Sequence, residues 1–352
     1  MRSRTRLALL IGLSVALTVK IQTPKLPLLC AFLLIFVSCC TFAAPVAIAI
    51  HGGAGAIERS QLSAAQERAI RADLERAAKA GYAVLQKGGS SVDASVAAVT
   101  ILEDSPYFNA GKGAVFNAYG INELDAAIMD GAKREAGAIA GVRRVRNPIL
   151  LAREVMQNSS HVLLSGTGAE SFARQQGIKF MPDRYFYTEA RWQQLLSARK
   201  LERLQPRAAL APKSYFGTVG AVALDQQGGL AAATSTGGMT NKRFGRVGDA
   251  PLIGAGTYAN RRCAVSATGH GEFFIRSVVA FDICARVAYR GDSIQEAAES
   301  VILEDLKLIG GGGGVIAMDQ KGSISMPFNS SGMYRAAIDV NGVLRVEIYE
   351  AK

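Results

Sequence analysis

The sequence predicts an α+β protein in which helices cover the outer faces of β-sheets. Apolar residues make up 49% of the 352-residue chain, which has 37 glycines and only 10 prolines, and such a composition suits a tightly turned globular core. Helix-like segments and short strand-like runs follow one another in blocks along the chain. The length does not require two domains, and no internal repeat occurs at a fixed period.

The first 43 residues have the pattern of a secretory signal peptide. They contain five basic residues, no acidic residue and two apolar runs, 7–19 and 26–37, each too short to span a bilayer comfortably. Small residues before the end of this segment suit cleavage after Ala43, which predicts a periplasmic or secreted protein. Because the first apolar run is surplus for such a signal, a true start further downstream and anchoring at the membrane stay as alternatives.

Charge and cysteine content exclude two other classes of protein. The net charge of +11 is concentrated in the N-terminal segment and in residues 184–213, and neither has the aromatic interleaving of a nucleic-acid binder. Of the five cysteines, only Cys263 and Cys284 lie beyond residue 43, without the spacing of metal ligands. An oxidising compartment permits one disulfide, but we expect two buried thiols, since one lies in a strand-like run and the other in a helix-like one.

The part of the chain before residue 180 is predicted to contain strands and helices in turn. Residues 45–50 form a buried strand that enters a glycine turn at His51-Gly-Gly-Ala-Gly55. Helices are predicted at 63–86 and 92–103, the second opened by a capping box at Ser90. Strands at 126–129 and 136–142, a helix at 149–157 after Pro148 and a short apolar run at 162–164 follow.

From about residue 180 to 217 this periodicity decays, and the segment is predicted to be a linker that is mobile before cleavage. Beyond it, strands at 219–224 and 230–236 are joined by a glycine-containing hairpin turn. The remaining elements are predicted as helices at 273–290 and 293–306, a hairpin of 315–319 with 324–326, and an edge strand at 344–349.

Thr218 is a candidate nucleophile because it stands between that linker and a strand. A threonine hydroxyl needs an adjacent base, and cutting the chain before the threonine supplies one in its own new α-amine. An α-amine titrates at about pH 8, so much of it is free base at neutral pH. Gly217, without a Cβ, tolerates the strained geometry that lets the hydroxyl attack its carbonyl.

Arg246 and Asp249 lie three residues apart in a glycine-flanked loop. A guanidinium holds a carboxylate and a carboxylate holds an ammonium group, so the pair suits an amino-acid-like ligand. The alternative is a mutual ion pair at the surface, which contributes little. A zinc site is not expected, because the three histidines include no His-x-x-x-His, and a serine-hydrolase triad is not expected without Gly-x-Ser-x-Gly.

Several motifs in a fixed order carry a family resemblance over residues 48–335. They are His51-Gly-Gly-Ala-Gly55, Phe108-Asn109-Ala-Gly111, Glu123-Leu-Asp-Ala126, Met129-Asp-Gly131, Gly217-Thr218-Val219-Gly220, the segments 231–242 and 245–260, and Thr268-Gly-His-Gly-Glu272. Together they resemble the plant-type asparaginases, or isoaspartyl peptidases, of the N-terminal-nucleophile hydrolases. The resemblance implies a four-layer α-β-β-α sandwich. It further implies cleavage into an α-subunit, 44–217, and a β-subunit, 218–352, with two αβ units in the particle.

The resemblance also assigns roles to individual residues. It implies catalysis by Thr218, Thr236, Thr268 and Gly269, substrate binding by Arg246, Asp249, Thr268, Gly269 and Gly271, and orientation of the nucleophile by Asn109. No cofactor is expected for catalysis. The loop 102–112 resembles one that wraps a structural sodium ion in backbone carbonyls, which hard cations accept as ligands. The expected carbonyl ligands are those of Leu102, Glu103, Ser105, Phe108, Ala110 and Lys112.

The function that this resemblance implies is that of a self-processing amidohydrolase. It would split β-aspartyl dipeptides and L-asparagine through an acyl-enzyme, with a small-molecule substrate and with no nucleic-acid or stable membrane partner. One alternative is a glycosylasparaginase of the aspartylglucosaminidase type, because Phe244 departs from the residues usual before Gly245. Another is a periplasmic protein that binds an amino acid without chemistry. The sequence does not rank asparagine against β-aspartyl peptides, since both share the aspartyl half.

Overall fold

The computed structural model describes residues 44–204 and 217–350. The predicted signal segment, 1–43, and residues 205–216 of the predicted linker lie outside these ranges. Within them, no helix combines the length and the apolarity that a membrane crossing requires.

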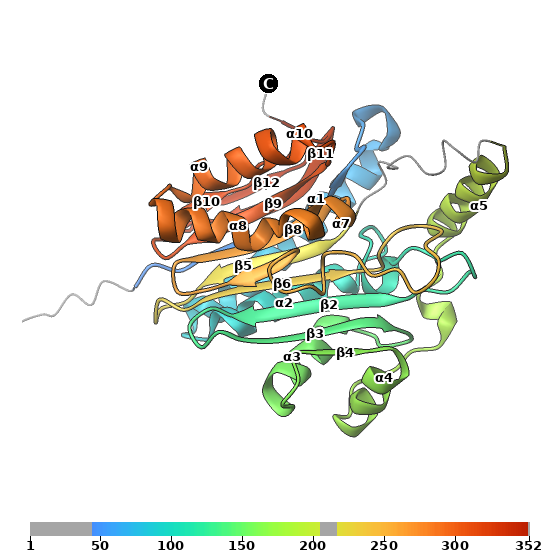
Figure 1. Ribbon diagram of the computed structural model, residues 1–352, viewed down its shortest axis with the longest axis horizontal. Coiled ribbons are helices and arrows are strands. Elements are labelled where there is room, and N and C mark those ends of the chain that lie inside the picture. Colours follow the sequence, from blue (N-terminus) through green and yellow to red (C-terminus); the bar gives the residue numbers. More distant parts are fainter. Residues whose placement is uncertain (1–43, 205–216, 351–352) are drawn as a thin grey trace, which may run out of the picture. The chain divides into compact units, whose positions relative to one another are not determined.

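A large sheet of eight strands carries most of the described chain (Figure 1). All neighbours pair antiparallel except β3 and β4, which are parallel. In spatial order the strands are β12 (Leu344–Glu347), β11 (Gly332–Ile338), β1 (Ala47–Gly55), β5 (Val219–Leu224), β6 (Leu230–Thr236), β2 (Leu124–Asp130), β3 (Glu135–Val142) and β4 (Leu163–Ser165).

A second, antiparallel sheet of four strands packs against the large one through β7, β8 and β9. Its spatial order is β10 (Ile324–Ser325), β9 (Gly313–Asp319), β8 (Cys263–Gly269) and β7 (Thr257–Ala259).

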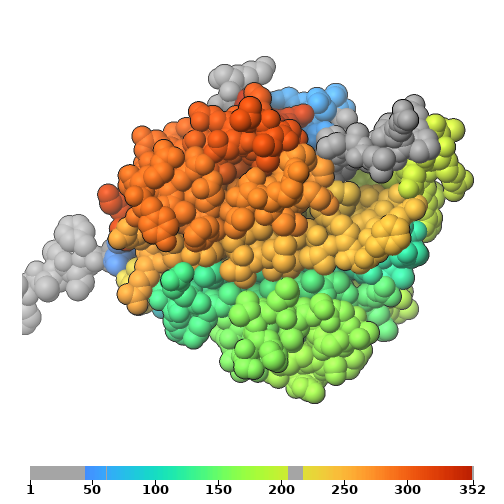
Figure 2. Space-filling view, in the orientation of Figure 1, coloured from blue at the N-terminus to red at the C-terminus, as the bar shows by residue number. Residues whose placement is uncertain are grey.

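Helices cover the outer faces of both sheets. On the large sheet these are α1 (Ala64–Gln86), α2 (Ser91–Glu103), α3 (Pro148–Asn158) and α4 (Gly166–Gln175); on the small sheet they are α8 (Val279–Ala285) and α9 (Ile294–Glu299) (Figure 1). Figure 2 shows the C-terminal helices in orange and the segment of α3 and α4 in green at opposite margins of the visible face. The predicted four-layer α-β-β-α sandwich is confirmed.

Shorter helical elements complete the chain. They are α5 (Glu189–Leu204), α7 (Gly271–Ser277), α10 (Leu306–Leu308), π-helical turns at Arg286–Arg290 and Ser300–Asp305, and 3-10 turns at Arg59–Gln61, Gly111–Gly113 and Asp183–Tyr185.

The core divides into two clusters because successive strand residues point to opposite faces. In β1, Ile48 and Ile50 pack in the cluster under the helices of the large sheet, whereas Ala47 and Ala49 pack in the cluster between the sheets. A strand buried on both faces reads as a continuous apolar run, which is why its residues could be predicted as a buried strand.

One prediction about β1 is wrong: the strand does not stop at a glycine turn after residue 50. It continues to Gly55 and absorbs the extra residue in a β-bulge between His51 and Gly53. Gly53 has φ +111°, and a Cβ there would lie 2.7 Å from Gly217 Cα. The bulge thus lets β1 approach the peptide that precedes Thr218, which needs glycine at this position.

The helix predicted at 273–290 is broken at Val278, whose φ is +49°. Because of the break, the first N–H groups of α8 do not donate to carbonyls of α7. Those of Ala280 and Phe281 donate instead to the carbonyls of Ala255 and Gly254, at 3.1 and 2.8 Å. Pairing with this loop replaces the hydrogen bonds that a continuous helix would have made.

The cysteines also differ from the expectation, since Cys263 and Cys284 form a disulfide with a Cα–Cα distance of 5.4 Å. The expectation of two thiols is therefore wrong. The reason is the layer order, which stacks α8 directly on β8, so that a strand residue and a helix residue come within bridging distance.

The predicted linker is partly regular, because α5 occupies residues 189–204. Arg191 fastens this helix to the loop around Asn109 by donating to the carbonyls of Gly113 and Tyr107 at 2.8 and 3.2 Å. Glu202, near its other end, accepts from Asn241 and Arg243 at 3.1 and 2.8 Å.

Candidate active site

Thr218 is buried directly before β5, with Thr236 at the end of the neighbouring strand. Because β5 and β6 pair with Val219 opposite Ser235, the two threonines lie side by side. The hydroxyl of Thr218 donates to that of Thr236 at 3.2 Å. The hairpin predicted from the sequence accounts for this contact.

The peptide carbonyl before Thr218 has two hydrogen-bond donors. Asn109 Nδ2 donates to Gly217 O at 2.7 Å and Thr236 Oγ1 donates to it at 3.3 Å. Asn109 is itself fixed, because the same amide nitrogen donates to Gly238 O at 2.7 Å and its Oδ1 accepts from Val115 N at 2.9 Å. These contacts polarise the carbonyl next to the candidate nucleophile.

A small cavity joins Thr218 to the residues predicted to bind substrate. It is lined by Gly217, Thr218, Thr236, Gly238, Met239, Arg246, Gly248, Asp249 and Gly269. Thr268, fully buried beside it in β8, accepts from Ala54 N at 3.2 Å, which leaves its own proton for another acceptor. A Cβ on Gly271 would lie 2.8 Å from both Arg246 Nη2 and Asp249 Oδ1, so the absence of a side chain keeps this corner open.

Arg246 is held by Glu272 rather than by Asp249. Its Nε and Nη2 donate to the two carboxylate oxygens of Glu272, both at 2.9 Å, and His270 Nε2 lies 3.1 Å from the same carboxylate. The hydrogen bond from His270 and the contacts with Arg246 hold the pKa of Glu272 well below its ordinary value. The mutual ion pair considered for Arg246 and Asp249 does not form.

Asp249 is buried, and burial raises its pKa to about 6, although the positive charge of Arg246 opposes the shift. Among the residues that the structure describes, its Oδ2 has no hydrogen-bond partner. A buried carboxylate oxygen without a donor is costly. Its place in the cavity suits a cationic group of a ligand.

A buried lysine, which the sequence gave no reason to single out, lies under the turn after Thr236. Lys242 Nζ is 3.8 Å from Asp125 Oδ2 and 3.9 Å from Glu123 Oε2, and a Cβ on Gly238 would be 2.9 Å from this nitrogen. Burial raises the pKa of Asp125 despite the lysine. The two acids belong to the motif at 123–126 and the lysine ends the motif segment 231–242, but nothing in the sequence indicates that these two motifs meet.

In the loop predicted to hold sodium, backbone atoms from different positions pack closely against one another. A Cβ on Gly111 would collide with the carbonyl oxygen of Glu103, and one on Gly113 with that of Phe108. The carbonyls of three predicted ligands already accept hydrogen bonds inside the loop, those of Leu102, Phe108 and Ala110. A carbonyl has two lone pairs, so this clustering of oxygens around glycines fits ligation by the backbone. Within 44–204 and 217–350, no group of three or more His, Cys, Asp or Glu side chains could hold a metal ion.

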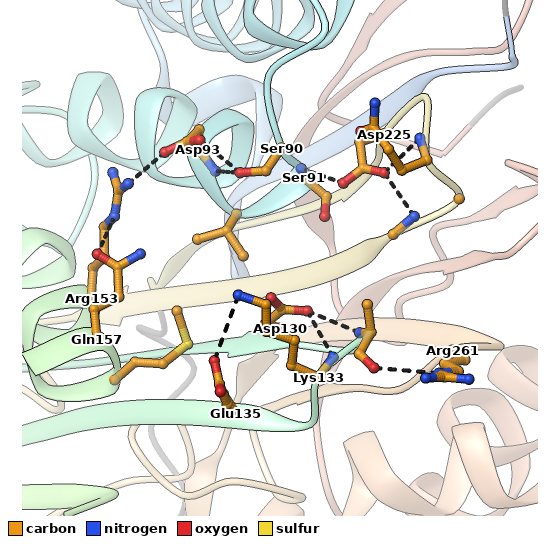
Figure 3. Close-up of a pocket in the computed structure, with 16 residues that line it drawn as sticks. Ser90, Ser91, Asp93, Asp130, Lys133, Glu135, Arg153, Gln157, Asp225 and Arg261 are labelled. Carbon is orange, nitrogen blue, oxygen red and sulfur yellow. Dashed lines mark hydrogen bonds and ion pairs between the residues drawn. The ribbon is translucent and has the colours of Figure 1, made fainter. Parts of the chain in front are cut away.

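A larger cavity, of about 660 Å³, lies away from Thr218 (Figure 3). It is lined at the far ends of β5 and β6 by the turn from Asp225 to Gly229, together with residues from α2, α3 and the β2–β3 turn. Its charges are satisfied by neighbours, as in the pair of Arg153 with Asp93 at 2.6 Å. We therefore assign the active site to the smaller cavity.

Two stacked sheets with a buried threonine at the start of a central strand define an N-terminal-nucleophile hydrolase. A family model described as asparaginase matches residues 44–348, and the chain belongs to this family. It is therefore an enzyme, an amidohydrolase.

Related proteins cover most of the chain. It is 52% identical over 293 residues to the isoaspartyl peptidase of Escherichia coli strain K12, an alignment that covers 82% of this chain and 91% of that protein. The isoaspartyl peptidase of Salmonella typhimurium is also 52% identical, with coverage of 82% and 94%. The isoaspartyl peptidase/L-asparaginase of Mus musculus is 44% identical over 302 residues, with coverage of 86% and 90%.

Proposed function

We propose that this enzyme hydrolyses β-aspartyl dipeptides and L-asparagine through an acyl-enzyme on Thr218. The observation that carries the proposal is the buried, unpartnered carboxylate oxygen of Asp249, which shares a cavity with Arg246 and the threonine hydroxyl. An aspartyl group offers an ammonium for the first and a carboxylate for the second. The printed names of the related peptidases agree with this substrate class.

The chain activates itself in this proposal by cutting the bond between Gly217 and Thr218. Thr218 Oγ1 attacks the Gly217 carbonyl carbon, and the developing oxyanion is stabilised by the donors already directed at Gly217 O, Asn109 Nδ2 at 2.7 Å and Thr236 Oγ1 at 3.3 Å. The C–N bond breaks, the nitrogen takes up the proton lost by the hydroxyl, and water hydrolyses the ester that remains. The products are a Gly217 carboxylate and a free α-amine on Thr218.

In the cleaved enzyme the α-amine takes the proton of the Thr218 hydroxyl as it attacks the substrate amide. The hydroxyl of Thr268 and the N–H of Gly269 stabilise the tetrahedral oxyanion. The amine returns the proton to the leaving nitrogen, and water then attacks the acyl-enzyme by the same route to release aspartate. Glu272 fixes the guanidinium of Arg246 from one side, so the remaining nitrogen is oriented for the substrate carboxylate.

Substrate assays test the proposal directly. Purified enzyme is given a β-aspartyl dipeptide, L-asparagine and aspartylglucosamine, and released aspartate is measured. We expect turnover of the first two, with Thr218→Ala lower by roughly four orders of magnitude or more and Thr167→Ala, at an exposed threonine of α4, unchanged. Preferred cleavage of aspartylglucosamine would favour the glycosylasparaginase alternative. Tight amino-acid binding without any turnover would favour the binding protein.

We further propose that the protein is exported by residues 1–43 and matures to two αβ units. The disulfide between Cys263 and Cys284 supports an oxidising compartment. Mass spectrometry of protein from the periplasm and light scattering of the purified particle test these two points; a retained N-terminus or a single αβ unit would contradict them.

The sodium site of loop 102–112 is part of the same proposal, with the ion in a structural role. Exchange of sodium for choline is expected to lower the midpoint of thermal unfolding, and sodium in the millimolar range to restore it with saturation. A midpoint that does not respond to sodium at constant ionic strength would exclude the site.

A further inference from the structure

A buried histidine of β1 contacts the backbone of the candidate nucleophile. His51 is fully buried; its Nδ1 lies 2.9 Å from the carbonyl oxygen of Thr218 and its Nε2 lies 2.9 Å from Ser266 Oγ. In the sequence, His51 is notable only as the first residue of the glycine-rich segment 51–55. Neither the self-cleavage nor the hydrolysis described above uses it.

The partners of His51 fix its protonation and its tautomer. A carbonyl oxygen only accepts hydrogen bonds, so Nδ1 carries the proton and donates it to Thr218 O. Nε2 is then the acceptor for the hydroxyl proton of Ser266. Burial also lowers the pKa of His51 to about 3, so the ring is neutral at physiological pH and does not supply a charge.

The hydrogen bonds continue beyond Ser266 between the two sheets. Ser266 Oγ lies 2.7 Å from Thr234 Oγ1, and Thr257 donates to Thr234 at 2.6 Å. With the Ser266 proton on the histidine, Thr234 must donate at its 2.7 Å contact with Ser266 rather than to Gly256 O at 3.1 Å. Thr257 Oγ1 also lies 2.9 Å from Ala250 O, and its single proton serves either this carbonyl or Thr234.

The space for this contact is kept open by a glycine. A Cβ on Gly220 would collide with Ser266 Oγ and would lie 2.5 Å from His51 Nε2. Gly220 is the second residue of β5, two positions after the nucleophile, where the sequence otherwise favours larger strand residues. Glycine at position 220 therefore leaves the space that the His51 ring and the Ser266 hydroxyl occupy.

We propose that His51, held by Ser266, is a positioning residue that fixes the main chain of Thr218 for both the self-cleavage and the hydrolysis. This inference rests on the proposed function. A fixed Thr218 carbonyl restricts rotation of the residue, so its hydroxyl stays directed at the Gly217 carbonyl before cleavage. After cleavage Thr218 is the first residue of its chain, and this anchor holds the α-amine and the hydroxyl in one geometry. Such positioning acts on the rate of the chemical steps rather than on substrate affinity.

The test compares His51→Leu, which removes the donor, with His51→Asn, whose amide nitrogen takes the place of Nδ1. Ser266→Ala removes the group that fixes the tautomer, and His161→Leu is a matched control at an exposed histidine. The rate of cleavage at Gly217–Thr218 is followed by intact mass, and kcat and KM for L-asparagine are measured on the processed fraction. Thermal unfolding of each variant reports whether it is folded.

For His51→Leu we expect slower cleavage and a kcat lower by about tenfold or more, because a buried carbonyl loses its donor, with KM within about twofold of wild type. His51→Asn should recover most of the rate, Ser266→Ala should fall between them, and the control should match wild type. A His51→Leu protein as fast as wild type, or a His51→Asn protein as slow as His51→Leu, would overturn the inference. If His51→Leu does not fold, Ser266→Ala decides: wild-type rates contradict the inference and a loss in kcat alone supports it.

The behaviour of the wild type distinguishes a failure of the proposed function from a failure of the positioning role of His51. A wild-type protein that neither cleaves itself nor releases aspartate contradicts the proposed function. A wild-type protein that does both, alongside unaffected His51 and Ser266 variants, contradicts only the positioning role.

Discussion

Asp249 and Glu272 are two carboxylates beside the same arginine with opposite environments. Glu272 is paired, and its pKa is lowered first by His270 and then by Arg246, whereas burial raises the pKa of Asp249 to about 6. The difference assigns them different tasks. Glu272 holds the arginine at all physiological pH values, and Asp249 is free to pair with a ligand.

The raised pKa of Asp249 predicts a pH dependence of product binding. Below about pH 6 the carboxylate is increasingly protonated and cannot pair with an ammonium group, so the inhibition constant of L-aspartate on processed enzyme should rise by about tenfold per pH unit. Succinate lacks the ammonium group and should show no such break. Inhibition by aspartate that stays constant from pH 7 to pH 5 would contradict this role of Asp249.

Glu103 at the end of α2 predicts a pH dependence of stability. Burial raises its pKa to about 8, against the hydrogen bonds that it accepts from Ser235 and Ile149. The unfolded chain releases this proton near the ordinary pKa of about 4.5, and the folded chain keeps it to higher pH. Stability is therefore expected to fall as pH rises between these values, by up to roughly 1.4 kcal/mol per pH unit.

Glu103→Gln should remove this slope and be more stable than wild type at pH 8. Its amide oxygen can keep the Oε1 contacts with Ser235 Oγ and Ile149 N, at 2.6 and 2.9 Å. Urea unfolding of both proteins from pH 5 to pH 8 measures the effect. Parallel stability curves would show that the carboxyl does not carry a raised pKa.

At the level of single residues, the sequence predicts the candidate nucleophile, the residue that orients it and the substrate-binding residues. It does not predict the buried contacts of His51 and Lys242. Thr218, Asn109 and Asp249 stand in motifs whose residue types suggest their use. His51 and Lys242 act through partners more than a hundred positions away, and one sequence does not reveal such pairings. Glu272 stands in the motif 268–272, but its contact with Arg246 joins positions 26 residues apart.

At the scale of elements, predictions are confirmed where a local signal is strong, as in the hairpin of β5 and β6, which combines apolar runs with a glycine turn. Ser90 caps α2, since its hydroxyl accepts from Asp93 N at 3.1 Å, but the reciprocal contact of the predicted capping box does not form there. The sequence predicts a linker where α5 lies, because this helix buries only Leu195 and so has little apolar periodicity. It is held by arginines that reach loop carbonyls, a tertiary effect without a local pattern.

The disulfide joins two elements of different layers, β8 and α8, and should stabilise their packing. It closes a loop with a sequence separation of 21 residues, for which chain entropy predicts about 3 kcal/mol. Replacing both cysteines by alanine should lower the free energy of unfolding by about this amount and make the protein insensitive to reductant. Equal stability of the oxidised wild type and the double variant would show that the bridge contributes nothing.

At the scale of the whole described fold, the layer order could be expected from the family resemblance, whereas the strand order could not. β11 and β7 were not predicted, and β11 is the neighbour of β1 in the large sheet. Stacking of the two sheets brings β1, β5 and β6 of one against β8 of the other. This stacking places Ser266 of β8 against His51, which contacts Thr218 O, and Thr268 of β8 against Ala54 of β1.

The central claim is that Thr218 becomes a nucleophile when the chain cuts itself before this residue. Intact-mass analysis with denaturing electrophoresis, on purified wild type and Thr218→Ala, tests it most directly. We predict two fragments from the wild type, one beginning at Thr218, and one uncut chain from the variant. A wild-type chain that stays intact, or a variant that is cut at the same bond, would contradict the account.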